Sequence, residues 1–368
     1  MPDTRTPLPT NVALSMLTLV RGGMGGSETY ARMLTELLSG VDGLSATAFV
    51  PATAAGFSAG IPEVVIGQVR GGPSTTERLT AVGSAIVHAR AVRAAMSDAD
   101  VVHYPFAVMA PTPARRQARV QTMHDVQHLD LPHLFSRAEL LYRRHFYDRA
   151  ARSADVVITI SEFARQRIVD LLGIPADRVE VSPLGVDTSR YIANRGQRER
   201  FVLYPARGWP HKNHARLIQA MATLRREQPD LRLVLTGGGL DSLGALPEWV
   251  DRRGLVSEAE LHALYRSAAV MAFPSLYEGF GLPPLEAMAS GCPVAVSSAG
   301  SLPEVCGAAA ILFDPADPEA IADGIATAMR DAERLTTAGI SHAAGFTWDR
   351  CRDAHVAAYR HAAQIRSK

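Results

Sequence analysis

Cysteine is scarce in this sequence of 368 residues. The three cysteines, Cys292, Cys306 and Cys351, are an odd number and have no metal-site spacing. This pattern argues against a disulfide framework and against a zinc site. We therefore expect reduced thiols, as in a cytoplasmic protein.

Long apolar runs and an excess of either charge are also missing. The longest apolar runs fall well short of the ~20 residues that a membrane-spanning helix needs. The net charge of +1 argues against a general nucleic-acid-binding protein. Residues 4 to 10 are polar and proline-rich, and they lack the pattern of a secretion signal. We expect a cytoplasmic protein whose contact with the membrane, if any, is peripheral and on the inner face.

The length allows two domains, and strand-like and helix-like segments alternate in both halves. This alternation predicts an α/β protein with parallel sheets covered by helices. A segment rich in Pro, Gly, Asn and charge, Pro183 to Gly196, separates the halves. The expected strands are 12–20, 44–50, 101–104, 118–123, 156–160, 201–204, 231–236, 269–273 and 293–297. The expected helices are 27–39, 80–96, 138–153, 214–227, 257–268, 283–290, 318–330 and a last one from Trp348 onward.

The segment from Pro274 to Pro293 contains two acids, Glu278 and Glu286, with seven residues between them. It follows an apolar run that predicts a buried strand. Gly281 belongs to a turn, and Pro283 suits the first turn of a helix. The N-terminus of such a helix offers free N–H groups and a partial positive charge, which favour phosphate. The two carboxylates beside it are suited to the hydroxyls of a sugar or a ribose.

Basic and glycine-rich segments follow other predicted strands. Arg207 and Lys212, five residues apart at a helix entrance, predict a clamp for a diphosphate. Gly22 to Gly26 follow the first strand and would let main-chain N–H groups approach an anion, although a tight turn is equally consistent. This loop is neither a P-loop nor the dinucleotide fingerprint, because position 28 is Glu. Gly237 to Gly239 predict a turn or, alternatively, another phosphate loop.

Histidines and aspartates elsewhere need separate interpretations. His124 ends a predicted strand, where an imidazole can bond a ligand hydroxyl. We interpret His128 and His133 as capped or core residues, because no standard zinc pattern includes them. Asp98 and Asp100 match an Asp-x-Asp pattern that binds Mg²⁺. They precede a strand, however, at the end away from the expected ligand, and predict a turn or cap.

Eight arginines and four acids lie between residues 115 and 152, interleaved with aliphatic and aromatic residues. We interpret this stretch as a solvated helix face. The alternative is a basic amphipathic face for anionic lipid or an acidic acceptor.

Taken together, these segments resemble the retaining GT-B glycosyltransferases of family 4, also called group 1. The likeness covers most of the chain, and its most specific part is the pattern Glu278-x7-Glu286. The supporting segments are 22–26, 124–128, Ser161-Glu-Phe, Pro183-Leu-Gly-Val-Asp, Trp209-Pro-His-Lys-Asn and Ser301-Leu-Pro-Glu-Val. The resemblance implies two Rossmann-like domains with parallel sheets facing across a deep cleft. Residues 1–190 would bind the acceptor and residues 191–349 the nucleotide-sugar, with the helix 350–368 packing back onto the first domain.

The resemblance also implies roles for the residues around the donor phosphates. Arg207 and Lys212 would hold the diphosphate and stabilise it as a leaving group. Gly25 and Gly26 would approach it from the first domain, and Glu286 would hold the ribose.

The donor sugar and the base have their own implied contacts. Glu278, with the N–H groups of Phe280, Gly281 and Leu282, would hold the sugar, and His124 would contact it near the reacting carbon. Glu278, His124, Arg207 and Lys212 are thus the implied catalytic residues. The base would lie near Arg252, Arg253 and Leu255, although the family generally has an apolar or aromatic residue at the position of Arg252.

The implied reaction transfers a hexosyl group from GDP-mannose or a UDP-hexose to an acceptor hydroxyl, with retention of configuration. Fixed cations and N–H groups can stabilise the charge that develops on the leaving diphosphate, so we expect neither a metal nor a cofactor. Glycans, lipid-linked glycans and small molecules are all candidate acceptors.

Three other functions fit parts of the pattern. A nucleotide-sugar epimerase of the same architecture would convert the donor without any acceptor. A nicotinamide-dependent oxidoreductase is disfavoured by the unmatched dinucleotide fingerprint. A non-catalytic nucleotide-sugar-binding subunit is disfavoured because the acids and cations are all present.

Overall fold

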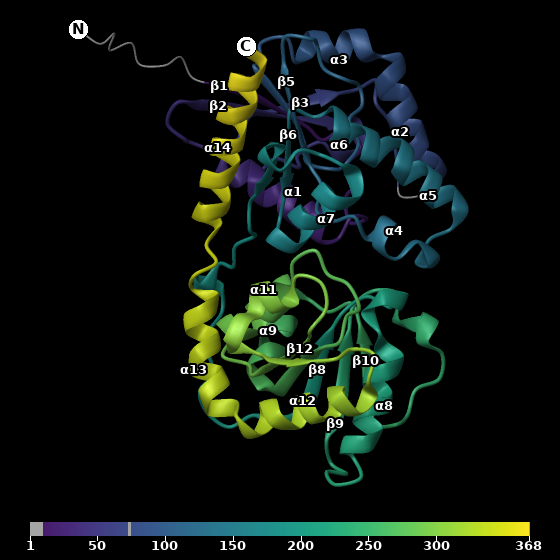
Figure 1. The fold of residues 1–368 in the computed structure, drawn as a ribbon, viewed down its shortest axis with the longest axis vertical. Helices are drawn as coiled ribbons and strands as arrows, with labels where there is room; N and C mark the ends of the chain where they lie inside the picture. Colours follow the sequence, from purple (N-terminus) through teal and green to yellow (C-terminus); the bar gives the residue numbers. More distant parts are fainter. Residues whose placement is uncertain (1–9, 73–74, 368) are drawn as a thin grey trace, which may run out of the picture. The chain divides into compact units, whose positions relative to one another are not determined.

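The computed structural model describes residues 10–72 and 75–367, which form two compact units (Figure 1). The first unit contains the described residues up to Ile160, Ala164–Ser182 and those from Asp349 onward. The second contains Ser161–Phe163 and Pro183–Trp348. The chain therefore leaves the first unit near its middle and returns to it for its last helix.

A parallel sheet of seven strands forms the centre of the first unit, in the order β3-β2-β1-β4-β5-β6-β7. β1 lies between β2 and β4, with Val12 opposite Ala46 on one side and Val101 on the other. Every residue of β4 and β6 is buried, as expected for parallel strands that are covered on both faces. The strands are β1 (Thr10–Ser15), β2 (Leu44–Pro51), β3 (Glu63–Ile66), β4 (Val101–Tyr104), β5 (Ala118–Thr122), β6 (Val156–Thr159) and β7 (Val179–Val181).

Two helices expected in the first unit are interrupted. The expected helix 80–96 is two helices, because the backbone of His88 (φ −93°, ψ 20°) departs from helical geometry. The expected helix 138–153 contains a π-helical turn, η3 (Arg144–Asp148). The helices are α1 (Gly26–Leu37), α2 (Thr75–Val87), α3 (Ala89–Ala95), α4 (Gln127–Asp130), α5 (Arg137–Arg143), α6 (Arg149–Ser153), α7 (Glu162–Leu172) and α14 (Trp348–Ser367).

The second unit contains a parallel sheet of six strands in the order β10-β9-β8-β11-β12-β13. Its strands are β8 (Glu199–Pro205), β9 (Arg232–Thr236), β10 (Val250–Gly254), β11 (Ala268–Phe273), β12 (Val294–Ser297) and β13 (Ile311–Phe313). Its helices are α8 (His214–Leu224), α9 (Glu258–Ser267), α10 (Leu282–Ala289), α11 (Leu302–Cys306), α12 (Pro318–Arg330) and α13 (Ala332–Ala343).

Each sheet reverses its strand order beside its first strand. The reversal falls between β1 and β4 in the first unit and between β8 and β11 in the second. In open parallel sheets the connections diverge at this point, and ligands bind outside the carboxyl ends of the strands there. Both units thus have Rossmann-like topology with one favoured ligand edge each.

The last helix, α14, lies alongside the first unit, where it is the yellow end of the chain (Figure 1). It buries Cys351, His355, Tyr359 and Ala362. All three cysteines are free and buried, and burial raises the pKa of the Cys292 thiol to about 12. Among the described residues, no helix is both long and apolar enough to cross a membrane.

Candidate active site

The loops that follow β8 and β11 carry most of the predicted donor residues. β8 and β11 are the neighbouring strands at which the order of the second sheet reverses. The main-chain N–H of Leu276, after β11, donates to the carbonyl of His211, after β8, over 2.8 Å. Residues that are far apart in sequence are therefore joined at the edge where a ligand is expected.

Lys212 and Glu278 form an ion pair at this edge. Lys212 Nζ lies 2.5 Å from Glu278 Oε1, and the two side chains are only 13% and 14% exposed. The ammonium also lies 5.4 Å from the centre of the Phe273 ring. The sequence predicted separate contacts for these two residues, with phosphate and with sugar. In the structure each is the partner of the other.

Asn213 fixes the end of the Lys212 turn and was not predicted as a site residue. It is the only described non-glycine residue with positive φ (62°), a conformation that Asn tolerates better than most residues. Its buried amide donates to the carbonyls of Pro274 (3.0 Å) and Pro315 (2.8 Å). Asn213 therefore ties the loop after β8 to the loop after β11.

Arg207 lies in a loop shaped by close main-chain packing. Its guanidinium carbon is 5.4 Å from the Trp209 ring, and no carboxylate among the described residues pairs with it. A Cβ on Gly208 would lie 2.2 Å from the carbonyl of Gly239, and one on Gly237 would lie 2.4 Å from that of Ala206. Gly208 and Gly237 are thus needed for the close packing of the Arg207 loop against the 237–239 loop, which agrees with the interpretation of Gly237 as part of a turn.

The N-terminus of α10 presents main-chain N–H groups beside the ion pair. Gly281, with φ 120°, precedes the helix. The Ser301 hydroxyl lies 2.6 Å from the carbonyl of Phe280 and 3.0 Å from that of Glu278, and the Ser161 hydroxyl donates to Gly279 over 2.7 Å. The carbonyls of the loop are therefore held. The N–H groups at 280–282 have no acceptor among the described residues. Such free donors suit an anion or a sugar oxygen.

Glu286 is held by two tyrosines. Tyr265 donates to Glu286 Oε2 over 3.0 Å, and Tyr191 is also hydrogen-bonded to the carboxylate. Burial raises the pKa of the Glu286 carboxyl despite these two hydrogen bonds. The tyrosines orient the carboxylate predicted to hold the ribose. Nothing in their sequence context marked them as site residues.

The residues predicted near the base have other partners within the unit. Arg252 donates to the carbonyls of Leu240 (3.3 Å) and Gly244 (3.1 Å). Arg253 pairs with Asp251 of the same strand, β10, and with Glu260 of α9 (Figure 1 labels both elements). Leu255, in contrast, is 80% exposed and is the member of the group that offers an open apolar surface.

His124 in the first unit is neutral and has an unused polar atom. It follows β5, and its Nε2 is buried without a hydrogen-bond partner. Burial lowers its pKa to about 4. The imidazole meets the Tyr30 ring edge-on, with centres 4.8 Å apart, and it lines a cavity of about 210 Å³. His124 therefore borders the cavity and has one ring nitrogen that no described residue satisfies.

A buried network of hydrogen bonds holds the hydroxyl of Tyr30. The Tyr30 hydroxyl contacts Thr122 Oγ1 (2.8 Å) and His355 Nε2 (2.6 Å). His103 links Thr122 (2.7 Å) to Tyr359 (2.8 Å). Since His355 and Tyr359 belong to α14, the last helix takes part in fixing the ring that packs against His124.

The glycine loop 22–26 precedes α1. Gly22 donates from its N–H to Glu28 Oε1 (2.9 Å), and Gly25 is the N-cap of the helix with φ 56°. A Cβ on Gly26 would meet no atom within 4 Å, and its φ is not positive. Neither packing nor backbone strain within the unit therefore requires glycine at position 26, so the space before α1 stays open to a ligand.

Two family models match the chain: Glycosyltransferase Family 4 over residues 24–190, and Glycosyl transferases group 1 over residues 186–341. The O-antigen chain mannosyltransferase B of Escherichia coli is 32% identical over 273 residues, which cover 67% of this chain and 71% of that protein. The chain belongs to the group 1, family 4 glycosyltransferases.

A second relative and a solved structure agree with this assignment. The GDP-mannose-dependent alpha-(1-6)-phosphatidylinositol monomannoside mannosyltransferase of Mycolicibacterium smegmatis is 31% identical over 287 residues, covering 69% of this chain and 73% of the relative. Sucrose-phosphate synthase from Thermosynechococcus elongatus superposes with a TM-score of 0.74 at 20% identity, over 95% of this chain and 98% of that one. The predicted GT-B fold is confirmed.

Three of the four residues of this glycosyltransferase that were given structural interpretations have structural partners. His128 is fully buried and lies 2.9 Å from Asp148. His133, in contrast, is exposed in the short turn 132–134, so the prediction of a core residue is wrong for it. Asp100 accepts from the N–H of Asn11 over 2.9 Å, and Asp98 contacts the neighbouring Ser97. Among the described residues, no group of three or more metal-ligating side chains is gathered.

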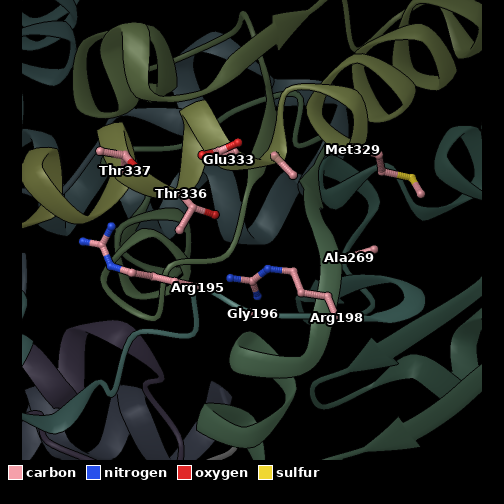
Figure 2. A pocket seen from close by; sticks show the side chains of 9 residues that line it. Arg195, Gly196, Arg198, Ala269, Met329, Glu333, Thr336 and Thr337 are labelled. Atoms are coloured by element: carbon pink, nitrogen blue, oxygen red, sulfur yellow. The ribbon is translucent and has the colours of Figure 1, made fainter.

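Another cavity of the glycosyltransferase, about 550 Å³, lies at the opposite edge of the second sheet, by the amino ends of β8 and β11 (Figure 2). Glu333 and Thr336 of α13 lie across from Arg195 and Arg198 (Figure 2). The Arg198 guanidinium donates only to carbonyls, including those of Asn194 (2.6 Å) and Arg266 (2.9 Å). Arg198 therefore closes the base of the sheet and is not available as a free ligand donor.

Proposed function

We propose that this glycosyltransferase transfers a mannosyl group from GDP-mannose to an acceptor hydroxyl, with retention of configuration and without a bound metal. The choice of donor is supported by the two mannosyltransferase relatives, one of which is named as GDP-mannose-dependent. The observation that carries the proposal is the Lys212–Glu278 pair beside the free N–H groups of α10.

In this proposal the ion pair opens when the donor binds. Lys212 turns from Glu278 to the diphosphate and, with Arg207, stabilises the charge that forms as the glycosyl–phosphate bond breaks. Glu278 is then free to accept hydrogen bonds from the sugar hydroxyls. Glu286, held by its tyrosines, accepts from the ribose. The roles given to His124, Gly25, Gly26, Arg252, Arg253 and Leu255 stay predictions.

Retention is proposed from the resemblance to retaining enzymes, and the pairing of both acids argues against a route through a covalent intermediate. Glu278 is paired with a cation and Glu286 is fixed by two phenols. The donor phosphate itself would then assist in removing the acceptor proton on the same face of the sugar.

The test uses the purified full-length chain, a mannoside acceptor and EDTA. We expect GDP release and an α-linked product with GDP-mannose, with the anomeric configuration read by NMR. A β-linked product would overturn retention, and strict dependence on added Mg²⁺ would overturn the metal-free scheme. Transfer from UDP-glucose alone would overturn the donor assignment. Epimerised donor formed without acceptor would favour the epimerase.

A chemical probe tests the Lys212 assignment directly. Lys212 and the C-terminal Lys368 are the two lysines of the sequence. We expect GDP-mannose to protect Lys212, but not Lys368, from acetylation by an N-hydroxysuccinimide ester, as measured by mass spectrometry. Equal labelling of Lys212 with and without donor would contradict its role as a phosphate contact.

A further inference from the structure

Two adjoining cavities of the first unit lie beside His124. The smaller, about 210 Å³, is lined by His124 and Asp125 at the end of β5. The larger, about 640 Å³, is lined by residues of α2, α5 and η3. Arg78, Tyr142, Arg143 and Tyr147 line both cavities. A ligand bound at His124 therefore lies next to the larger cavity.

The larger cavity exposes an apolar surface whose aromatic residues pack against the core of the unit. Leu141 is 70% exposed and Leu79 is 46% exposed, although both are large apolar side chains. Tyr142, Phe146 and Tyr147 pack against the hydrophobic core that lies between the sheet and α2–α3. Exposed leucines in a cavity whose wall packs against the core indicate a binding site for an apolar ligand.

The wall between the two cavities carries positive charge that the unit does not neutralise. The Arg143 guanidinium lies 4.6 Å from the Phe135 ring centre, and its carboxylate partner is Glu139, at 3.6 Å and 49% exposed. Such a surface pair is weak. Arg78 is exposed and has no hydrogen bond or ion pair with any residue in the described part of the chain. Burial raises the pKa of Tyr142 to about 12, so its phenol stays neutral and can donate beside these cations.

The π-helical turn explains how these side chains reach the wall. η3 inserts a wider turn between α5 and α6, and turns of this kind are frequent at functional sites. Asp148, the last residue of η3, is buried and lies 2.9 Å from His128. The His128–Asp148 pair therefore anchors the turn that presents Phe146 and Tyr147.

We propose that these cavities bind an acceptor whose sugar is joined through a phosphate to an apolar chain. The sugar lies at His124, the phosphate lies against Arg78 and Arg143, and the chain lies along Leu79, Leu141 and Phe146. The assignment rests on the proposed function, because the accepting hydroxyl must lie beside the reacting carbon of the donor sugar, which His124 is predicted to contact. An uncharged, fully polar glycan would leave both the arginines and the leucines without partners.

The test measures binding of dodecyl phosphate, below its micellar concentration, to the full-length protein by calorimetry. We expect dodecyl phosphate to bind at least about tenfold more tightly than either inorganic phosphate or uncharged dodecyl maltoside. Arg143→Gln should weaken dodecyl phosphate about tenfold or more and leave dodecyl maltoside unchanged, whereas Leu141→Ser should weaken both. Arg137→Gln is the matched control, because Arg137 lies on the same helix α5 but lines neither cavity.

Equal losses in Arg137→Gln and Arg143→Gln would overturn the proposal in favour of diffuse attraction between the basic helix and an anionic surface. Binding to phosphatidylglycerol vesicles that is insensitive to Leu141→Ser would support that same alternative and count against the cavity.

GDP-mannose binding, measured in parallel, distinguishes failure of the acceptor site from failure of the donor assignment. Loss of the dodecyl phosphate pattern with donor binding intact refutes the acceptor site alone. The expected pattern without donor binding refutes the donor assignment alone.

Discussion

Replacing Glu286 with glutamine should move donor affinity and protein stability in opposite directions. The carboxylate accepts a hydrogen bond from Tyr265 at 3.0 Å and another from Tyr191, and burial raises its pKa. Glutamine keeps the size and one acceptor oxygen, so Tyr265 keeps its partner. The variant loses the charge and one of the acceptors proposed for the ribose.

The expected loss of affinity is that of one hydrogen bond to a charged group, about 1.5–3 kcal/mol. This corresponds to a Kd for GDP that rises about 10- to 150-fold. Stability should change the other way. Because the folded-state pKa of Glu286 is raised, its ionisation destabilises the fold at neutral pH. This penalty begins to shrink as pH falls through the raised pKa, and it is gone below the ordinary pKa of a glutamate. The variant should therefore melt at a higher temperature at pH 7, and the difference should vanish in acid.

Calorimetric titration with GDP and thermal unfolding between pH 4 and 8 measure both quantities on the same samples. Glu319→Gln is the matched control, because Glu319 lies exposed in the first turn of α12 in the same unit. A lower melting temperature for Glu286→Gln at pH 7 would show that the ionised carboxylate stabilises the fold. Unchanged GDP affinity would refute its role at the ribose.

Three further expectations follow from the site and its supports. Lys212→Met should lower kcat about 10²- to 10³-fold by removing a cation from the leaving diphosphate, and near-normal turnover would contradict the clamp. Because burial lowers the pKa of His124 to about 4, it is neutral at physiological pH. The pH profile of the transfer rate should therefore contain no inflection near pH 6.5 that is due to His124. The wild-type and His124→Asn profiles should have the same shape in this range. Tyr30→Phe should lower the free energy of unfolding by about 1–3 kcal/mol in urea titrations, because Thr122 and His355 lose a buried partner. An unchanged urea midpoint would show that the network is not needed for stability.

The strands that the sequence did not predict are β3, β7, β10 and β13, and these are the outermost strands of the two sheets. The physical reason is that an edge strand is short and has only one neighbour, so it needs no continuous apolar run. β7 has three residues and includes a glutamate, and β10 carries Asp251, Arg252 and Arg253. The interior strands, buried on both faces, were predicted because burial requires apolar residues throughout.

The residues of the candidate site also fall into those that the sequence predicted and those that it did not. Glu278, Lys212 and Glu286 were predicted as site residues because charged residues after strands and glycine turns have a recognisable pattern. Their pairing depends on which strands are neighbours in the sheet, and a linear pattern contains no such information. Asn213 was missed because its left-handed backbone follows from two distant carbonyls. Tyr30 and His355 are 325 positions apart, and only the path of α14 brings them together.

The return of α14 to the first unit has a consequence for how the protein is made. A ribosome completes the second unit once Trp348 has emerged, whereas the first unit, although begun earlier, still lacks its last helix. Until then the Tyr30 hydroxyl and the His103 imidazole lack His355 and Tyr359 as partners. The nascent chain should therefore acquire its stable structure out of order, the second unit before the first. A chain that terminates just before α14 should be recognised by cellular proteases through its N-terminal half.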